Sequence, residues 1–589
     1  MISTLKRTSL MKSQLSLHQR LLWWGAACVL IWTLSGLTHP LMSWFGPKQA
    51  NYRPPALSLT VSEEILTPDS LSLAHLQSIA HLMVASQKEN VSIAKVVPSQ
   101  QGAMLQLTYN QEQPREYLPL TALVSESPIL DKHTIATNAV LPQYDQQQAK
   151  WLASYYTGRK TDEVEEIEFI TEFSGAYPWV NRLLPVYKVR FSGDDQLTAF
   201  IHTETSQLAS LTNNTRLQLQ TLFRTLHTFD FLDEQDNLRV AAVFTAMLIL
   251  VSVSISGFGL VLLLKRRKIK TPDRRWHRRL GYVIWLPLLA WSISGGYHLI
   301  QSAYVDAPSG LRLNDTFNFE GFTVLNQDDL ENGNSLTSFN TTLLNHSELE
   351  GKSILAASLL NIDQQLILRL SITDKREQSK GPAGPHAHHQ QQVKKFKGNP
   401  AEKSSLYLDA LTLMPTKITD KHRAIALAEQ FRAIHGQTIH ELDTHELDNH
   451  GMNNHETENH ELNSLDEIAS VQMIHRFGPN YDFRNKRLPV WQVTMKDEHG
   501  TQLFVDPATA ILVDQSQTID RAERWSFSML HKWNFLVPLT GRFKRDIVIV
   551  VTLSLLTIIT LLGMTMGLKR LKQRRTRALL TPSAEELSS

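Results

Sequence analysis

The chain has 589 residues, of which 42% are hydrophobic and 20% charged, and its formal net charge is +2. This length is too great for one compact domain, and a charge so close to neutral gives no argument for nucleic-acid binding. The one cysteine, Cys28, excludes a disulfide within the chain and a cysteine-ligated iron–sulfur cluster.

Four segments are long and apolar enough to cross a hydrocarbon core of about 30 Å. In chain order we predict transmembrane helices at 21–45, 240–264, 280–300 and 547–568. Between and around them lie an N-terminus at 1–20, a long loop at 46–239, a short loop at 265–279, a second long loop at 301–546 and a tail at 569–589. A signal peptide is the alternative for the first span, but no small-x-small cleavage motif follows it.

Lysine and arginine clusters precede the first span, fill the short loop and follow the last span. Because such clusters stay in the cytoplasm, we expect both termini inside and both long loops outside. The Asn, Gln and charged composition of the long loops favours a bacterial periplasm. The expected location is therefore the bacterial inner (cytoplasmic) membrane, with membrane lipids as partners.

The sequence matches itself in two places. The first and third spans share a His-x-Arg-Leu start and a later Trp-x-x-Ser-Gly-x-x-His pattern, at an offset of 259 residues. The ends of the two long loops match at an offset of 304 residues, including Leu226–Leu232 with Leu530–Leu536. Since both copies begin on the same side, they are parallel repeats. We expect an all-α membrane bundle of four helices, made of two such repeats.

Each long loop ends in a predicted β-hairpin. Strands at 185–191 and 197–201 flank Ser-Gly-Asp-Asp, and strands at 489–495 and 501–505 flank Asp-Glu-His-Gly. A helical pattern precedes the second hairpin at 424–432. We therefore expect two outer α+β domains, at 46–239 and 301–546, with helices packed on antiparallel sheets.

Three short motifs resemble those of the PepSY-associated transmembrane protein family. They are Trp-His-Arg-Arg-Leu-Gly at 276–281, Val-Asp-Pro-Ala-Thr at 505–509 and Leu-His-Lys-Trp-Asn-Phe-Leu at 530–536. The resemblance covers nearly the whole chain apart from an insertion in the second loop. It implies PepSY-like outer domains. Some members of the family look like inner-membrane haem proteins that reduce ferric siderophores, and others are associated with iron uptake, so the resemblance also implies a role in iron uptake.

Histidines inside or beside membrane spans are costly and usually functional. His18 and His39 are 21 residues apart, as are His277 and His298, a helical rise of about 31 Å. Trp32, Gly36, Trp291 and Gly295 share the stripe that each pair defines. Imidazole pairs of this kind suit haem b. We predict one site near the inner face and one or two near the outer face, with the ligand pairing open, and the candidate ligands are His18, His277, His39, His298, His227 and His531. The alternative is that these histidines anchor helix ends among lipid headgroups and the glycines serve helix packing.

A histidine-rich insertion at about 436–462 carries a five-residue repeat. Because five residues advance about 140° on a helix, no single face results, and we interpret the stretch as flexible. Loose capture of a divalent metal and a drifted, solvated repeat are both open. The histidines concerned are His435, His440, His445, His450, His455 and His460, with a smaller cluster at His386, His388 and His389.

The first hypothesis for function is a membrane haem-b oxidoreductase, a ferric-siderophore reductase. It would take electrons from a quinol or a cytoplasmic reductase and pass them to a periplasmic ferric chelate. The alternatives are a non-enzymatic PepSY-domain protein that binds a peptide or partner, and a metal or siderophore permease. No acidic residue interrupts the span cores, which disfavours proton-coupled transport, and no nucleotide-binding loop points to NAD(P)H.

Overall fold

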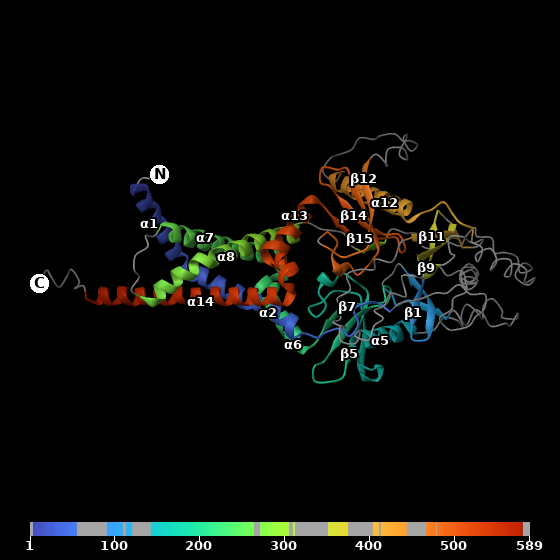
Figure 1. Cartoon of the computed structure of the whole chain (residues 1–589), viewed down its shortest axis with the longest axis horizontal. Helices are drawn as coiled ribbons and strands as arrows, with labels where there is room; N and C mark the ends of the chain where they lie inside the picture. Colours follow the sequence, from blue (N-terminus) through green and yellow to red (C-terminus); the bar gives the residue numbers. More distant parts are fainter. Residues whose placement is uncertain are drawn as a thin grey trace, which may run out of the picture. The chain divides into compact units, whose positions relative to one another are not determined.

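The structure, a computed structural model, describes residues 4–55, 91–109, 113–119, 143–263, 271–304, 310–312, 352–363, 365–374, 404–410, 414–444, 467–478 and 480–580. The chain divides into two compact units, which are described separately (Figure 1). The helical unit comprises Met1–Gly46, Asn214–Asp306 and Ile519–Ser589. The sheet unit comprises Pro47–Asn213 and Ala307–Thr518.

Long helices dominate the helical unit. They are α1 (Thr4–Arg20), α2 (Leu22–Phe45), α6 (Asn214–Phe223), α7 (Asp236–Leu263), α8 (Pro272–Tyr304), α13 (Thr518–Ser526) and α14 (Val537–Leu580). Among the described residues, four stretches are long and apolar enough to cross a membrane: Leu22–Phe45, Asp230–Leu263, Pro272–Tyr304 and Asn534–Thr576. Each contains nearly all of one predicted span, as expected for a multi-pass membrane protein.

Two of the long helices extend well beyond the apolar runs that predicted them. α8 begins at Pro272 and α14 continues to Leu580, well beyond the predicted 280 and 568. Backbone hydrogen bonds continue through polar residues, whereas a hydropathy pattern detects only the apolar part. α14 contains one break, at Gly541, whose φ of 77° is a left-handed conformation that glycine adopts without strain.

The core of the helical unit is aliphatic and draws on all four long helices. It comprises Cys28, Val29, Val243, Ala246, Met247, Leu250, Ile284, Leu553 and Leu556. One hydroxyl inside the unit links two of these helices: Ser254 Oγ on α7 donates to the Trp285 carbonyl on α8 at 2.6 Å. The buried free thiol of Cys28 belongs to this core.

The sheet unit contains short helices and antiparallel strands. The helices are α5 (Tyr144–Thr157) and α12 (Asp420–Thr444). The strands are β1 (Val91–Ser99), β2 (Gly102–Tyr109), β3 (Glu116–Pro119), β4 (Val164–Ile170), β5 (Val186–Phe191), β6 (Thr198–His202), β7 (Gln207–Thr212), β8 (Leu311–Arg312), β9 (Lys352–Ile362), β10 (Gln365–Asp374), β11 (Ser404–Asp409), β12 (Ile468–Ile474), β13 (Val490–Met495), β14 (Gln502–Asp506) and β15 (Ile511–Ser516).

These strands form three sheets. Their orders are β11-β10-β9-β1-β2-β3, β12-β13-β14-β15-β8 and β4-β5-β6-β7. In the first sheet, β1 pairs antiparallel with β9 through Ala94 with Leu359 and Lys95 with Ser358, so strands from both long loops share one sheet. Both predicted hairpins are confirmed, as β5 with β6 and β13 with β14.

Helices α5 and α12 each cover one face of a smaller sheet. Ala149, Leu152 and Tyr156 of α5 pack on β5, β6 and β7, and Ala424, Leu427 and Phe431 of α12 pack on β13, β14 and β15. In both helices the three residues recur at spacings of three and four, which places them on one apolar face. The expected arrangement of helices on antiparallel sheets is thus present.

The histidine-rich stretch begins inside a helix. α12 continues to Thr444 and carries His435 and His440, so the expectation of a flexible segment is wrong for these two positions. An amphipathic start at Asp420 can propagate a helix through the first repeats, since each added residue gains one backbone bond. His386, His388, His389, His445, His450, His455 and His460 lie outside the described residues. Within those residues no group of three metal-ligating side chains occurs.

Candidate cofactor site in the helical unit

Two of the predicted histidines meet at one level of the helical unit. His18 near the end of α1 and His277 near the start of α8 have ring centroids 6.4 Å apart and ring planes at 67°. Their Nδ1 atoms are engaged by the neighbouring spans. His18 Nδ1 lies 3.0 Å from Ser256 Oγ on α7, and His277 Nδ1 lies 3.0 Å from the Ile559 carbonyl on α14.

A second pair forms at the other end of the spans. His227 and His531 have ring centroids 6.3 Å apart and ring planes at 87°. Each belongs to a π-helical turn, Arg224–Thr228 or Phe527–His531, which a short 3-10 turn separates from the following long helix. Such π-helical turns insert one extra residue per turn and often mark functional positions. His227 Nδ1 lies 3.0 Å from Ser35 Oγ and His531 Nδ1 lies 3.3 Å from Ser294 Oγ.

All four paired imidazoles therefore share one arrangement. Nδ1 is held by a hydroxyl or carbonyl of another helix, and Nε2 makes no hydrogen bond within the described residues. Metal-bound histidines in proteins are oriented in this way, with the non-ligating nitrogen bonded to a second group. The four rings are thus held with one nitrogen committed and the other available.

Three glycines lie against these rings. A Cβ at Gly257, Gly563 or Gly295 would lie 3.4–3.5 Å from Cε1 of His18, His277 or His531 respectively. The predicted partner Gly36 differs, because a Cβ there would meet Leu553 rather than His227. A larger side chain at the first three positions would therefore push on an imidazole, and at Gly36 on an aliphatic chain.

His39 and His298 lie one ring further out than the second pair. His39 contacts Phe223, with centroids 6.3 Å apart, and Phe223 stacks on His227 at 4.5 Å. In the same way His298 stacks on Phe527 at 4.0 Å, and Phe527 stacks on His531 at 4.7 Å. The aromatic rings His39, Phe223, His227, His531, Phe527 and His298 thus form a continuous row.

The two ends of this row are not equivalent. His298 Nδ1 lies 2.6 Å from Glu523 Oε1 on α13, where the carboxylate can accept a hydrogen bond. His39 contacts Phe223 and forms no ion pair with a carboxylate in the part of the chain that the structure describes. The two predicted tryptophans lie beside the second pair. Trp32 packs on Phe229, with ring centroids 5.3 Å apart. Trp291 packs on Trp533 at 5.0 Å, and its Nε1–H donates to the His531 carbonyl.

The spacing of each pair fits two ligands on one metal ion. An imidazole nitrogen binds a transition metal at about 2 Å, and it lies about 1 Å from the centre of its ring. Two imidazoles on opposite sides of one iron therefore have ring centres roughly 6 Å apart, by the usual metal–nitrogen distance. Both pairs match this value, and two axial imidazoles are the ligand set of low-spin haem. The donor chemistry thus fits haem b at both levels.

Sequence reasoning identified the histidines but missed most of their partners. Ser256, Phe223, Phe527 and Glu523 carried no signal of their own. Phe223 and Phe527 do match at the offset of 304 and stand four residues before His227 and His531, so the self-comparison could have found them. Ser256 has no such signal, because Leu562 stands before Gly563 where Ser256 stands before Gly257, and His277 bonds the Ile559 carbonyl instead.

Comparisons with known proteins do not add to this picture. No family model matches the chain, and neither a curated protein nor a solved structure matches it.

Proposed function

We propose that this chain is a membrane haem-b protein that carries electrons across the bilayer and delivers them to a ferric chelate on the outer side. The observation that supports this most is the pair of facing histidine couples. Each has a ring-centre distance of 6.3–6.4 Å and Nδ1 atoms already held by other groups.

His18 with His277 would hold one haem, and His227 with His531 would hold another. When bound, haem supplies a one-electron ferric/ferrous couple at each level. His277 and Ser294, the partner of His531, are 17 residues apart on α8, a rise of roughly 25 Å. Two couples at this separation would span most of the apolar core, whose thickness is about 30 Å.

The protein's own groups have defined tasks in this proposal. Ser35, Ser256 and Ser294 fix the tautomer and orientation of the imidazoles, which sets ligand basicity. The aliphatic core around Leu250 and Leu553 keeps water out and the dielectric low, which tunes the reduction potential. Phe223 and Phe527 cover the outer pair and leave His39 and His298 as its most distal rings.

The direction of electron flow rests on the lysine and arginine distribution. We infer a bacterial inner-membrane location with both termini in the cytoplasm, a quinol or cytoplasmic reductase as donor, and a ferric chelate or siderophore as acceptor. Alkaline phosphatase fused after Thr205 or Glu350 should be active, because both positions would be periplasmic. Inactive fusions would reverse the proposed direction.

The absorption spectrum of the purified protein tests the cofactor. We expect a Soret band and a sharp reduced α-band, with two haems per chain. His18→Ala or His277→Ala should remove or convert one of them, and His227→Ala or His531→Ala the other. Reduction of a ferric chelate by the reduced protein should fail in each variant.

Two further replacements sharpen this test. His39→Ala and His298→Ala should retain both low-spin haems, because their ring contacts are with phenylalanines rather than with an opposing imidazole. His499→Ala, in the β13–β14 loop of the sheet unit, is the neutral control. A colourless wild-type protein, or normal spectra in all four paired-histidine variants, would refute the proposal.

A further inference from the structure

A buried cluster of charged side chains surrounds a cavity in the sheet unit. The cavity has a volume of about 430 Å³ and lies among all three sheets, with Leu183 and Pro185 on one side and Ile511 and Val513 on another. Four guanidiniums line it: Arg115, Arg182, Arg312 and Arg487. Glu204 is the carboxylate that lines it, and its side chain is fully buried.

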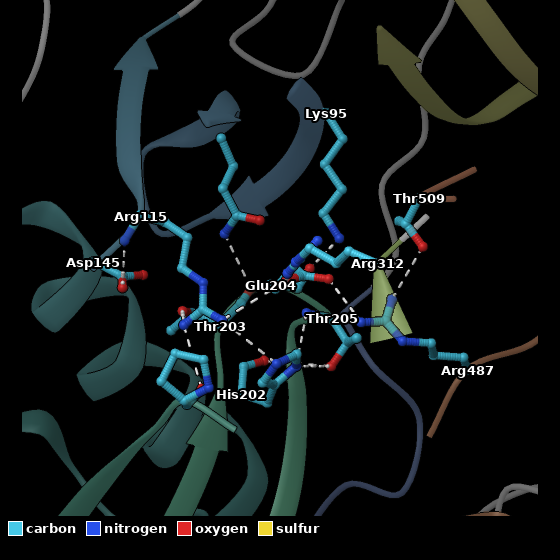
Figure 2. Close-up of polar contacts among 12 residues, drawn as sticks. Lys95, Arg115, Asp145, His202, Thr203, Glu204, Thr205, Arg312, Arg487 and Thr509 are labelled. Carbon is cyan, nitrogen blue, oxygen red and sulfur yellow. Dashed lines mark hydrogen bonds and ion pairs between the residues drawn. The ribbon is translucent and has the colours of Figure 1, made fainter. Parts of the chain in front are cut away.

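Glu204 is shared among three of these arginines. Its Oε1 accepts from Arg487 Nη2 at 2.7 Å, and its Oε2 accepts from Arg312 Nη2. Figure 2 shows the guanidiniums of Arg115, Arg312 and Arg487 arranged around this one side chain, with Lys95 beside them. Lys95 Nζ donates to the Glu204 backbone carbonyl. One carboxylate thus lies at the centre of four cationic side chains.

The carboxylates around the cavity do not balance the cations. Arg487 also contacts Asp506 at 3.5 Å, and Arg182 pairs with Asp514 at 3.0 Å. With Glu204, three carboxylates of the described residues pair with the side chains that line the cavity, whereas four guanidiniums line it and Lys95 adjoins them. His202 cannot supply further positive charge, because burial and Arg115 hold its pKa well below the ordinary value. An uncompensated positive charge in a buried site favours an anion.

Arg115 is held unusually loosely for a buried guanidinium. Its side chain is 1% exposed, and it lies 3.8 Å from Glu204, 3.5 Å from His202 Nε2 and 3.3 Å from Thr203 Oγ1. Charge-assisted hydrogen bonds are normally 2.7–2.9 Å long. Arg115 Nε and Arg312 Nη1 are buried and have no hydrogen-bond partner within the described residues. Such donors are rare, because leaving them unpaired costs free energy.

Arg369, on β10 of the six-stranded sheet, shows how a buried guanidinium with a complete carboxylate partner is held. Arg369 donates from Nε to Asp420 Oδ1 at 2.8 Å and from Nη2 to Oδ2 at 2.9 Å, a complete fork-to-fork pair. Asp145, which stands where Asp420 does at the start of its helix, instead accepts from the backbone N–H of Arg115 and from Tyr117. The guanidinium of Arg115 lines the cavity and, among the described residues, has Glu204 at 3.8 Å rather than a bidentate carboxylate partner.

From these observations we propose that the cavity binds a small oxyanion, a carboxylate or phosphate group carried by a molecule of modest size. The free donors of Arg115 and Arg312 would meet its oxygens, since guanidiniums bind both groups in a bidentate fork. The volume equals that of roughly fourteen water molecules at about 30 Å³ each, enough for a ligand of about a dozen non-hydrogen atoms. This site lies wholly within the sheet unit and does not depend on haem.

Titration calorimetry of the full-length protein in detergent tests the proposal, with citrate and inorganic phosphate as the two probes at constant ionic strength. We expect one probe or both to bind saturably with one site per chain and a dissociation constant of about 1 mM or tighter. Citrate alone would identify a carboxylate ligand, and phosphate alone a phosphoryl ligand. Absence of saturable binding by both probes overturns the proposal.

Variants at the cavity rim connect binding to these residues. Arg312 is 22% exposed and, among the described residues, pairs with Glu204, so Arg312→Gln should fold and weaken binding at least tenfold. Arg312→Lys should weaken binding less, because the positive charge remains. Arg159→Gln, which removes a surface guanidinium paired with Glu163 and Asp195, is the matched control. Equal binding in all four proteins would show that the probes act as general salts. The haem spectrum should be unchanged in every one, which separates this result from the proposed function.

Discussion

Replacing Glu204 by glutamine should destabilise the sheet unit strongly. The side chain is fully buried and accepts hydrogen bonds from Arg312 and Arg487, with Arg115 at 3.8 Å. Glutamine keeps the shape and one acceptor oxygen, but it removes the negative charge and directs an amide NH₂ at a guanidinium. Breaking one partner of a buried ionic network costs about 3–5 kcal/mol, because the remaining charges stay buried and uncompensated.

The expected shift in melting temperature follows from this free energy. For a unit larger than 200 residues, 1 kcal/mol corresponds to about 2 °C, so Glu204→Gln should lower the melting temperature by roughly 6–10 °C on the same scale. Tryptophan fluorescence during heating measures this, with chloride as the only added anion so that no oxyanion replaces the lost charge. Glu168→Gln is the control: Glu168 is 52% exposed and pairs with Lys188, and exposed pairs contribute about 0–1 kcal/mol.

The pH dependence of stability gives a second test of whether the ionised Glu204 carboxylate stabilises the fold. Burial alone would raise the pKa of Glu204, but Arg312 and Arg487 lower it well below the ordinary 4.5. A carboxyl with a depressed folded pKa stabilises the fold above its unfolded pKa and loses that contribution as the pH falls through the folded pKa. The difference in the free energy of unfolding between wild type and Glu204→Gln should thus be constant above about pH 4.5 and become smaller below it. A difference in unfolding free energy below about 1 kcal/mol at pH 7, or a difference that grows in acid, would refute the idea that the Glu204 charge stabilises the sheet unit.

Two predictions concern the helical unit. Ser35→Ala or Ser294→Ala should weaken haem binding roughly 10–100-fold and shift the midpoint potential of the outer haem, because each hydroxyl holds Nδ1 of a paired histidine. The Ser252 hydroxyl bonds a carbonyl of its own helix, so Ser252→Ala should change neither haem affinity nor the potential measured in a redox titration. Gly295→Val should disturb the outer couple, since its Cβ would lie 3.5 Å from His531 Cε1 and its methyl groups closer, whereas Gly36→Val should crowd only Leu553. Identical absorption spectra for Gly295→Val and Gly36→Val would contradict this reading of the glycines.

The helices and hairpins could be predicted because their signals are local. A run of apolar residues such as 547–568 is sufficient to identify a span, and Pro185–Phe191 with its Ser-Gly-Asp-Asp turn is sufficient for a hairpin. Helix ends were less accessible, as α8 shows by starting at Pro272, because polar helical turns lack the apolar signal.

The histidine pairing was only partly accessible to sequence reasoning. Helical spacing placed His39 and His298 at the outer ends of their spans, and the Leu-His boxes placed His227 and His531 at the same level. The two histidines that face each other, His227 and His531, both lie in π-helical turns, at Arg224–Thr228 and Phe527–His531. No pattern in a single sequence specifies such a turn.

The cluster around Glu204 was not predictable at all. Glu204 and Arg487 are 283 residues apart and meet because three sheets converge on the same cavity. Arg312 arrives on the two-residue strand β8, which pairs with β15 through Ile511 and Leu512. Isolated charged residues in a polar loop are normally solvated, so sequence alone favours a surface position for each of them.

The matched segments also explain why like residues meet in pairs. A residue that lies near a twofold axis faces its own counterpart, whereas one that lies away from the axis faces something else. In the helical unit His18 faces His277 and His227 faces His531, so both couples lie near such an axis, while His39 and His298 lie away from it and contact phenylalanines. A twofold arrangement needs only one histidine per repeat to build a two-imidazole site. The contacts depart from this symmetry at Glu523 beside His298 and at Leu553 beside Gly36, where the two matched segments have different neighbours.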